Sequence, residues 1–152
     1  MSVEKVKIFK VRPDVKIPVR AHSTDAGLDL FFCPVEGVAV RIAPGQSALL
    51  DTGVKIEVPS NCMLQVMNKS GIASKSHLIT GACVVDEGYT GEIFVNLHNI
   101  GKDIQFIEPG QKIAQAIFVR IEKPELWEIE EDNIYGGETS RGGGGLGSTG
   151  LV

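Results

Sequence analysis

The chain has 152 residues, of which 43% are hydrophobic and 22% are charged, and its formal net charge is −4. This length suits one domain that buries its own core without needing metals or disulfides. The negative charge argues against a protein that coats nucleic acid, because such proteins carry a basic excess or a basic stripe.

The cysteines and the N-terminal residues give information about the cellular compartment of the protein. Cys33, Cys62 and Cys83 cannot all pair within one chain and form no C-x-x-C spacing, so we expect free thiols. Residues 1–11 alternate instead of forming an apolar leader, and no stretch approaches a membrane span. We therefore expect a cytoplasmic protein (host cytoplasm for a viral gene, with the nucleus possible in a eukaryote) and neither a membrane nor a nucleic-acid partner.

Alternation of apolar and polar residues is the dominant pattern, and it predicts half-buried β-strands. Alternating or more strongly apolar segments occur in chain order at 5–11, 38–42, 52–58, 92–97 and 112–121. Turn signals rich in Gly, Pro, Asn and Asp separate them, at 11–14, 43–46, 58–61, 86–92, 99–103 and 108–111. Many short strands joined by turns predict an all-β fold, either a sandwich, a jelly roll or a barrel.

Two segments depart from this pattern. Residues 70–78 could form a short helix, with Ser70 as its N-cap. From about Glu130 the alternation ends, and the chain continues into a glycine-rich segment that cannot pack a core. The sequence therefore predicts a β-barrel body over residues 1–129 and a flexible C-terminal arm over residues 130–152.

The usual catalytic motifs are missing from the sequence. There is no G-x-x-x-x-G-K-[ST] loop and no G-x-S-x-G elbow, and His22, His77 and His98 lack the spacing of a zinc site. Five short polar clusters remain: "AGLDL" at 26–30, "NKSGIASK" at 68–75, "VVDEGYTG" at 84–91, "GQKIAQ" at 110–115 and "RGGGGLGSTG" at 141–150.

Each cluster has a plain structural interpretation when it is taken alone. Asp29 could be an outward-facing strand residue, and Ser70 could simply cap a helix, although a helix start beside Lys69 could also bind an anion. Residues 86–91 could form an ordinary hairpin turn. Gln115 is harder to explain in this way, because it lies in an apolar strand where a buried amide needs partners.

Taken in order, the five clusters resemble the five motifs of the trimeric deoxyuridine triphosphate nucleotidohydrolases (dUTPases). Those motifs read A-G-x-D-L, R-S-G-x-A-x-K, G-x-I-D-x-x-Y-x-G, G-x-x-x-A-Q and R-G-x-x-G-F-G-S-T-G, and the resemblance runs from about Ala26 to Gly150. It implies a jelly-roll-like β-barrel, a homotrimer, and Mg²⁺-dependent hydrolysis of dUTP to dUMP and pyrophosphate. This reaction lowers dUTP and supplies dUMP for thymidylate synthesis.

The resemblance also implies roles for the residues around the base and sugar. Asp86 would orient the attacking water as a general base. Tyr89 would pack under the deoxyribose and leave no room for a 2′-hydroxyl. The backbone of Ala82, Cys83 and Val84 would read the uracil edge.

Further roles concern the triphosphate. Lys69, Ser70, Gly71 and Gln115 match phosphate-binding positions, and Asp29 matches an aspartate that holds the water shell of Mg²⁺. The arm would cross to another subunit and close over its nucleotide, which excludes water. Its residues with an implied contact to the nucleotide are Arg141, Leu146, Gly147, Ser148 and Thr149.

The sequence departs from the family pattern at three positions. Lys69 replaces an arginine and keeps the charge without the bidentate geometry, Leu146 replaces a phenylalanine that stacks on uracil, and Cys83 replaces a glycine. One alternative is therefore a binding or regulatory protein with this fold and weak catalysis. A less favoured alternative is a dCTP deaminase-type enzyme, because Asn96 stands where such enzymes need a glutamate.

Overall fold

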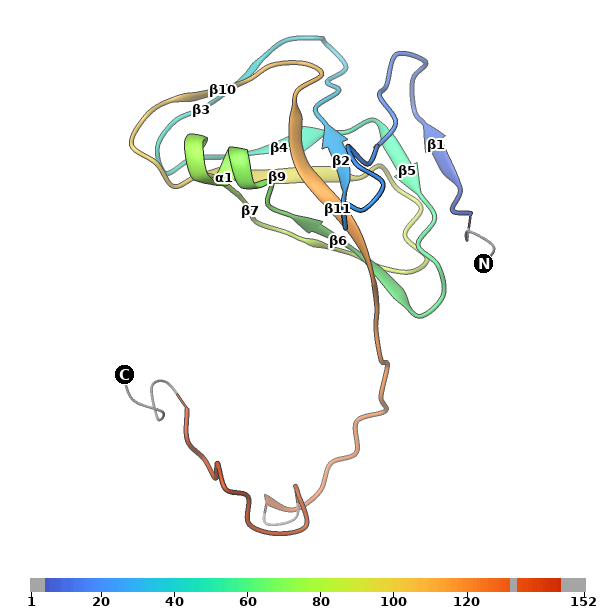
Figure 1. Ribbon diagram of the computed structural model, residues 1–152, viewed down its shortest axis with the longest axis vertical. Helices are drawn as coiled ribbons and strands as arrows, with labels where there is room; N and C mark the ends of the chain where they lie inside the picture. Colours follow the sequence, from blue (N-terminus) through green and yellow to red (C-terminus); the bar gives the residue numbers. More distant parts are fainter. Residues whose placement is uncertain (1–4, 132–133, 146–152) are drawn as a thin grey trace. The chain divides into compact units, whose positions relative to one another are not determined.

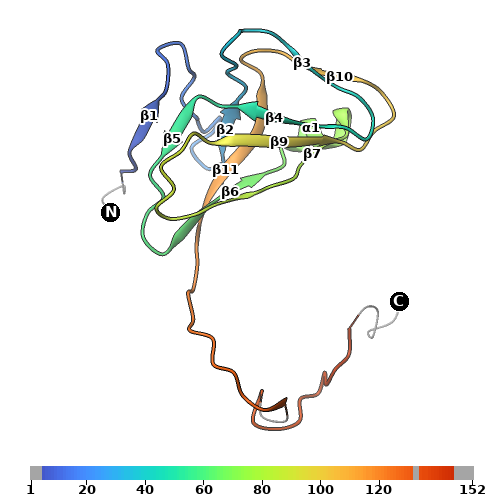
Figure 2. The ribbon, with the colours of Figure 1, turned by 180° about the vertical axis from the view of Figure 1, so that it is seen from behind.

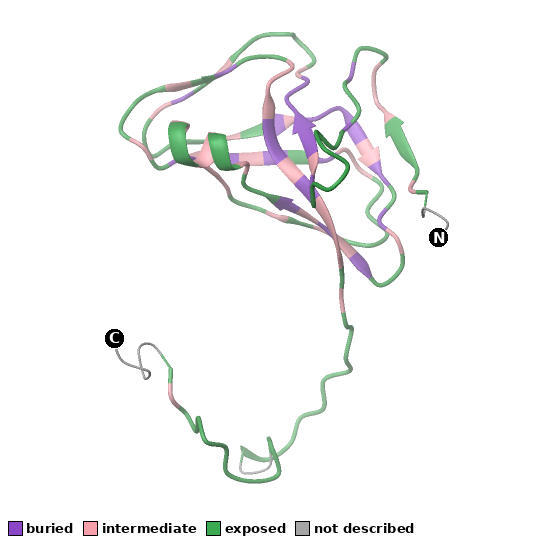
Figure 3. Cartoon of the chain, in the orientation of Figure 1, coloured by how far each residue is buried: buried purple, intermediate pink, exposed green. Residues whose placement is uncertain are grey.

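The computed structural model describes residues 5–131 and 134–145, and the chain divides into two compact units at residue 122. The second unit, drawn in orange to red in Figure 1, contains no α-helix or β-strand in its described residues. Nearly all of those residues are exposed, as Figure 3 shows. This division falls seven residues before the predicted boundary at 129, and the closing of the arm over a site stays a prediction.

The described residues of the first unit, 5–122, form eleven short strands and one helix, and every strand pair among them is antiparallel (Figures 1 and 2). A four-stranded sheet has the order β2-β11-β6-β8, a three-stranded sheet has the order β4-β9-β7, and β1-β5 and β3-β10 form two-stranded ribbons. The elements are β1 (Ile8–Lys10), β2 (Leu28–Phe31), β3 (Val40–Ile42), β4 (Ser47–Asp51), β5 (Val54–Ile56), β6 (Cys62–Met67), α1 (Ser70–Ser76), β7 (Leu78–Thr80), β8 (Val84–Val85), β9 (Phe94–Asn99), β10 (Gln105–Ile107) and β11 (Lys112–Arg120).

The hydrophobic core joins the two larger sheets. Leu30, Leu64 and Ala116 enter it from the four-stranded sheet, and Leu50 and Leu97 enter it from the three-stranded sheet. Along β6 and β9 these residues alternate with more exposed ones, because successive side chains of a strand point to opposite faces. The prediction of an all-β, jelly-roll-like fold with one short helix is confirmed.

The outer face of the four-stranded sheet carries polar side chains. Asp29 of β2 is the pairing partner of Gln115 of β11, which in turn pairs with Met67 of β6. The residues next to Asp29 and Gln115 in these strands, Leu30 and Ala116, point into the core. Asp29 and Gln115 therefore share the face that points away from the core.

The short helix begins one residue earlier than predicted. Ser70 is its first residue and Lys69 is its N-cap, with extended backbone angles (φ −91°, ψ 124°) and no capping side-chain hydrogen bond. The prediction of Ser70 as N-cap is thus wrong, because Lys69 is the last extended residue and Ser70 already belongs to the first turn of the helix. None of the described helices is long and apolar enough to span a membrane.

The predicted strand segments agree with β1, β3, β5, β9 and β11. Six further strands, β2, β4, β6, β7, β8 and β10, fall outside them. The sequence of β6, "CMLQVM", is rich in Cys, Met and Leu and therefore carries a weak β-strand signal, although its burial alternates strictly.

Candidate active site

Asp29 lies at the centre of a small charged group on the outer face of the four-stranded sheet. Its Oδ1 accepts a hydrogen bond from Lys69 Nζ at 2.6 Å, and Lys112 Nζ lies 2.6 Å from its Oδ2. We call Asp29, Lys69 and Lys112 the cation cluster. The interpretation of Asp29 as an outward-facing strand residue is right about the face. However, the two lysines cover Asp29, which is only 5% exposed.

The charges around Asp29 set its ionisation. Burial acts to raise the pKa of Asp29, but the contacts with Lys112 and Lys69 outweigh it, so its pKa lies below the ordinary value. Asp29 therefore carries its negative charge at neutral pH, and this charge attracts both lysine ammonium groups and holds them beside the carboxylate.

Gln115 lies beside the cation cluster and has a partner for its amide. Its Nε2 donates to the carbonyl oxygen of Asn68 at 3.0 Å, which ties β11 to the segment before α1. Gly27 packs directly against this side chain, so that a Cβ at residue 27 would overlap Oε1 of Gln115. The glycine of the first motif is thus needed for the position of the glutamine of the fourth motif.

The turn after β8 positions Asp86 and Tyr89. The Tyr89 N–H donates to the carbonyl oxygen of Asp86 at 3.2 Å, and the Tyr89 hydroxyl donates to the carbonyl oxygen of Glu92 at 2.9 Å. A Cβ at Gly91 would overlap the Tyr89 ring. The close packing on Gly91 and the hydroxyl contact fix the ring orientation, although 47% of Tyr89 is exposed.

The chain around this turn, which we call the hairpin (residues 82–94), lines a pocket of about 340 Å³. We call it the hairpin pocket. Its walls come from backbone and mostly apolar side chains, which suits a flat, weakly polar group. The pocket brings together five predicted residues, Ala82, Cys83, Val84, Asp86 and Tyr89, with Leu49, Val66, Val85, Glu92, Ile93 and Phe94.

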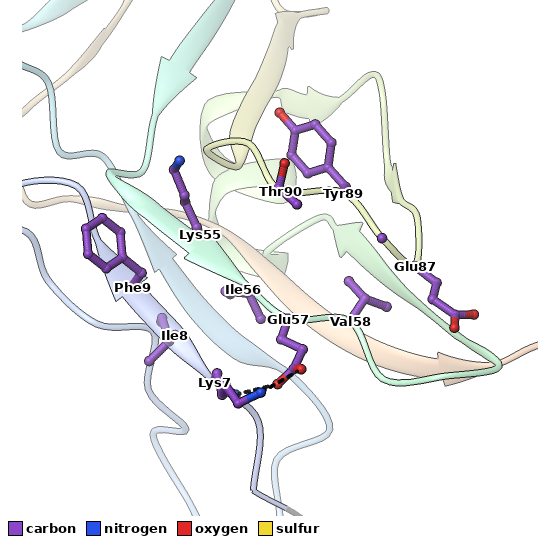
Figure 4. Close-up of a pocket in the computed structure, with 11 residues that line it drawn as sticks. Lys7, Ile8, Phe9, Lys55, Ile56, Glu57, Val58, Glu87, Tyr89 and Thr90 are labelled. Carbon is purple, nitrogen blue, oxygen red and sulfur yellow. Dashed lines mark hydrogen bonds and ion pairs between the residues drawn. The ribbon is translucent and has the colours of Figure 1, made fainter.

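A larger hollow of about 640 Å³ lies between β1, β5 and the turn at 87–90 (Figure 4). Phe9 and Lys55 line it, and Lys7 pairs with Glu57 at its edge. Tyr89 is the one predicted residue in its wall. The predicted chemistry therefore lies in the smaller pocket, which contains Asp86.

Within one chain, the hairpin pocket and the cation cluster are separate groups of residues. None of Asp29, Lys69 and Lys112 lines the pocket, and neither does Gln115. The pocket takes side chains from both faces of the four-stranded sheet, since Val66 belongs to the core and Val84 pairs with Gln65 on the outer face. The structure thus brings the predicted residues together as two groups and not as one.

The remaining predicted residues lie in or near α1 and in the arm. Ser70 and Gly71 are exposed at the start of α1, directly after Lys69. Arg141 forms a local turn in the arm, where its Nε donates to the carbonyl oxygen of Gly144 at 3.1 Å. The other predicted arm residues lie outside the described part of the chain: Leu146, Gly147, Ser148 and Thr149.

Sequence reasoning did not select Lys112, although it lies within the fourth cluster. A lysine at the start of a strand gives no signal in isolation. The ion pair with Asp29 appears only when β2 and β11 are adjacent.

A pocket with a mostly apolar lining and two ammonium groups held by one carboxylate suit an all-β protein that binds a ligand with a flat, weakly polar part and an anionic part. Comparison with known proteins narrows this class. The sequence model of the dUTPase family matches residues 13–150. The chain belongs to the dUTPase family.

Relatives from distant organisms support this assignment. A deoxyuridine 5′-triphosphate nucleotidohydrolase of Gloeothece citriformis is 39% identical over 150 residues, which cover 97% of this chain and 98% of the relative. A mouse protein of the same name is 39% identical over 145 residues, which cover 95% of this chain and 85% of the relative.

Solved structures agree in fold. A mutant dUTPase of Staphylococcus bacteriophage 80alpha, solved with dUpNHpp, superposes with a TM-score of 0.87 at 26% identity and covers 98% of this chain and 100% of its own. A mutant dUTPase of phage phi11 of S. aureus, described with a structural Mg(II) ion, has a TM-score of 0.76 at 25% identity, covering 84% of this chain and 98% of its own.

The dCTP deaminase alternative is not favoured. Besides the family match, the Asn96 amide on β9 has structural partners, because its Oδ1 lies 2.7 Å from His98 Nε2 and its Nδ2 donates to Ala48 O at 3.4 Å. An amide also cannot shuttle a proton as a carboxylate does.

Proposed function

We propose that this chain hydrolyses dUTP to dUMP and pyrophosphate, with the base and sugar bound in the hairpin pocket. The observation that carries the proposal is that Asp86 and Tyr89 line one pocket together with Ala82, Cys83 and Val84. One nucleoside in this pocket can then contact all three assigned groups: the Asp86 carboxylate near the attacking water, the Tyr89 ring at the sugar, and the backbone of residues 82–84 at the base. The reaction lowers dUTP and supplies dUMP for thymidylate synthesis.

In this proposal each residue of the pocket has a separate task. Asp86 accepts a proton from the water that attacks the α-phosphorus, and it holds that water in line with the leaving pyrophosphate. The Tyr89 ring lies against the deoxyribose and leaves no space for a 2′-hydroxyl. Backbone N–H and C=O groups from Ala82 to Val84 bind the polar edge of uracil, and Cys83 sets how closely that edge approaches.

The triphosphate is bound by groups outside the pocket. Lys69 supplies positive charge, while Ser70 Oγ, the Gly71 N–H and the Gln115 amide donate hydrogen bonds to phosphate oxygens. The glycine-rich backbone of the arm can follow phosphates closely and present its N–H groups to them. The arm residues in this role are Arg141, Gly147, Ser148 and Thr149, with Leu146 covering the base.

The residues fit a Mg²⁺ ion that phosphate and water hold. The described residues contain no group of three His, Cys, Asp or Glu side chains placed to bind a metal ion. The two lysines occupy two of the roughly four acceptor positions of the Asp29 carboxylate and cover it, so a water of the metal's shell would bind a remaining position only when a lysine moves aside. When bound, the ion neutralises charge on the pyrophosphate that leaves.

We also infer a homotrimer in which subunits share sites. None of the three residues of the cation cluster lines the hairpin pocket of the same chain. In this proposal a second copy supplies the lysines to that pocket, and a third supplies the arm. Mixing Asp86→Asn with Gln115→Ala subunits tests this, because shared sites regain part of the activity that each variant lacks.

The cysteines support a cytoplasmic location. Cys33, Cys62 and Cys83 are all free thiols, and Cys33 and Cys62 are buried. Free thiols are typical of the reducing cytoplasm.

A substrate panel tests the proposed function. We expect pyrophosphate release from dUTP to be much faster, at equal concentration, than release from dCTP, dTTP or UTP. Omitting Mg²⁺ is expected to slow the reaction with dUTP. Equal rates with dUTP, dTTP and UTP would contradict the proposal and favour a weakly catalytic binding protein with this fold.

A further inference from the structure

Lys112 has no assigned role in the proposed reaction, yet it completes the cation cluster. Its Nζ lies 2.6 Å from Asp29 Oδ2, and on the other side of the carboxylate Lys69 Nζ lies 2.6 Å from Oδ1. The two lysines come from different elements, Lys69 from the N-cap of α1 and Lys112 from the first residue of β11. One buried carboxylate thus holds two ammonium groups in fixed places.

An irregularity in β11 is what places Lys112 on this face. In a regular strand, Lys112 would share a face with Ala114, which points into the core. The register between β11 and β2 shifts between these two residues, so that Ala114 pairs with Leu30 and Lys112 pairs with Phe31. Such a bulge inserts one residue and turns the side chain beyond it to the opposite face. Lys112 therefore shares the outer face with Asp29.

The charges of the cluster give Lys112 a function. Lys69 and Asp29 alone would form a neutral pair, which attracts a triphosphate weakly. With Lys112 the group carries one net positive charge. The lysine side chains remain partly open to solvent, 32% exposed for Lys69 and 40% for Lys112, so this charge is accessible to a ligand. Gln115, a proposed phosphate ligand, lies opposite Asp29 on the neighbouring strand.

We propose that Lys112 is a positioning residue of the phosphate site: it neutralises Asp29, and it thereby leaves the positive charge of Lys69 free to bind the triphosphate. This inference rests on the proposed phosphate role of Lys69. The β11 bulge is the structural device that makes it possible.

A Lys112→Met variant tests the inference. We expect the Kd of the dUTP analogue dUpNHpp to rise about tenfold, since one unit charge at such a range in a partly solvated site has an effect of that order. The Kd of dUMP, which lacks two of the phosphates, should rise much less. Lys112→Arg should bind dUpNHpp like the wild type. Lys102→Met, the same change on an exposed loop, is the matched control and should also leave binding unchanged.

The double variant Asp29→Asn/Lys112→Met separates charge from structure. It restores one net positive charge without restoring the ion pair, so we expect most of the lost dUpNHpp affinity to return. If Lys112→Met binds dUpNHpp like the wild type, or if the double variant binds no better than Lys112→Met, the inference is wrong. Failure of the wild type itself to bind dUpNHpp would instead contradict the proposed function.

Discussion

The hairpin pocket and the cation cluster are built in opposite ways. The pocket comes largely from one continuous stretch, residues 82–94, and is lined by backbone and apolar groups. The cation cluster joins side chains of β2, β11 and the N-cap of α1 around one buried carboxylate. A pocket of the first kind selects shape, whereas a cluster of the second kind binds charge. Changes in the pocket should therefore alter chemistry and selectivity, and changes in the cluster should alter phosphate affinity and acid stability.

The largest effect is expected for Asp86→Asn in the hairpin pocket. The variant keeps the shape of the side chain and loses the proton acceptor, so turnover of dUTP should fall about 100-fold or more. The Kd of dUpNHpp should change little. Single-turnover kinetics and titration measure the two quantities separately. Asp103→Asn, an exposed aspartate outside the pocket, is the matched control and should keep full activity. Unchanged turnover in Asp86→Asn would remove Asp86 from the general-base role.

Removal of residues 140–152 tests whether activity requires the C-terminal arm in addition to the hairpin pocket and the cation cluster. Because the deletion removes Arg141 and the glycine-rich segment, we expect kcat/KM for dUTP to fall about tenfold or more, as for other cations that stabilise phosphoryl charge. The circular dichroism spectrum and the assembly state should stay those of the full chain. A truncated protein with full activity would show that the arm has no part in catalysis.

The sequence predicts the hairpin pocket well and the cation cluster only in part. Asp86 and Tyr89 lie within one turn, so their proximity is already encoded in a local motif. Asp29 and Lys69 are 40 residues apart, and their ion pair depends on the order of strands β2, β11 and β6. Local propensity contains no information about such an order, so only the family resemblance connects these residues before the structure is known.

The position of Lys112 is even harder to predict from the sequence than that of Asp29 or Lys69. Regular alternation would place it with Ala114 on the core face, and the register shift that turns it outward has no sequence signal of its own. The start of α1 fails for a related reason. Ser70 is a good N-cap residue, but the helix begins one residue earlier, with Lys69 as its N-cap, and the Lys69 ammonium group contacts Asp29. In both places a tertiary ion pair accompanies a departure from the local pattern.

Tyr89 allows the selectivity of the pocket to be tested apart from its chemistry. Tyr89→Ala removes the ring proposed to lie against the sugar, and we expect the preference for dUTP over UTP to fall about tenfold, a typical loss when a site no longer excludes one hydroxyl. Competition between the two nucleotides in one assay measures this ratio. Tyr89→Phe keeps the ring on Gly91 and loses only the contact with Glu92, so it should keep most of the preference. A retained preference in Tyr89→Ala would show that another group reads the sugar.

The smallest effect concerns the stability of the cation cluster in acid. Because contacts with Lys112 and Lys69 hold the pKa of Asp29 below its unfolded value, folding is stabilised while Asp29 is charged. This contribution is fully present above the unfolded value of about 3.9 and is lost as the pH falls from there through the lower folded pKa. The free energies of unfolding of the wild type and Asp29→Asn, measured with urea, should therefore differ at pH 7, begin to converge as the pH falls below about 4, and meet below the folded pKa of Asp29. A difference that persists unchanged at low pH would mean that Asp29 stabilises the fold by packing and not by charge.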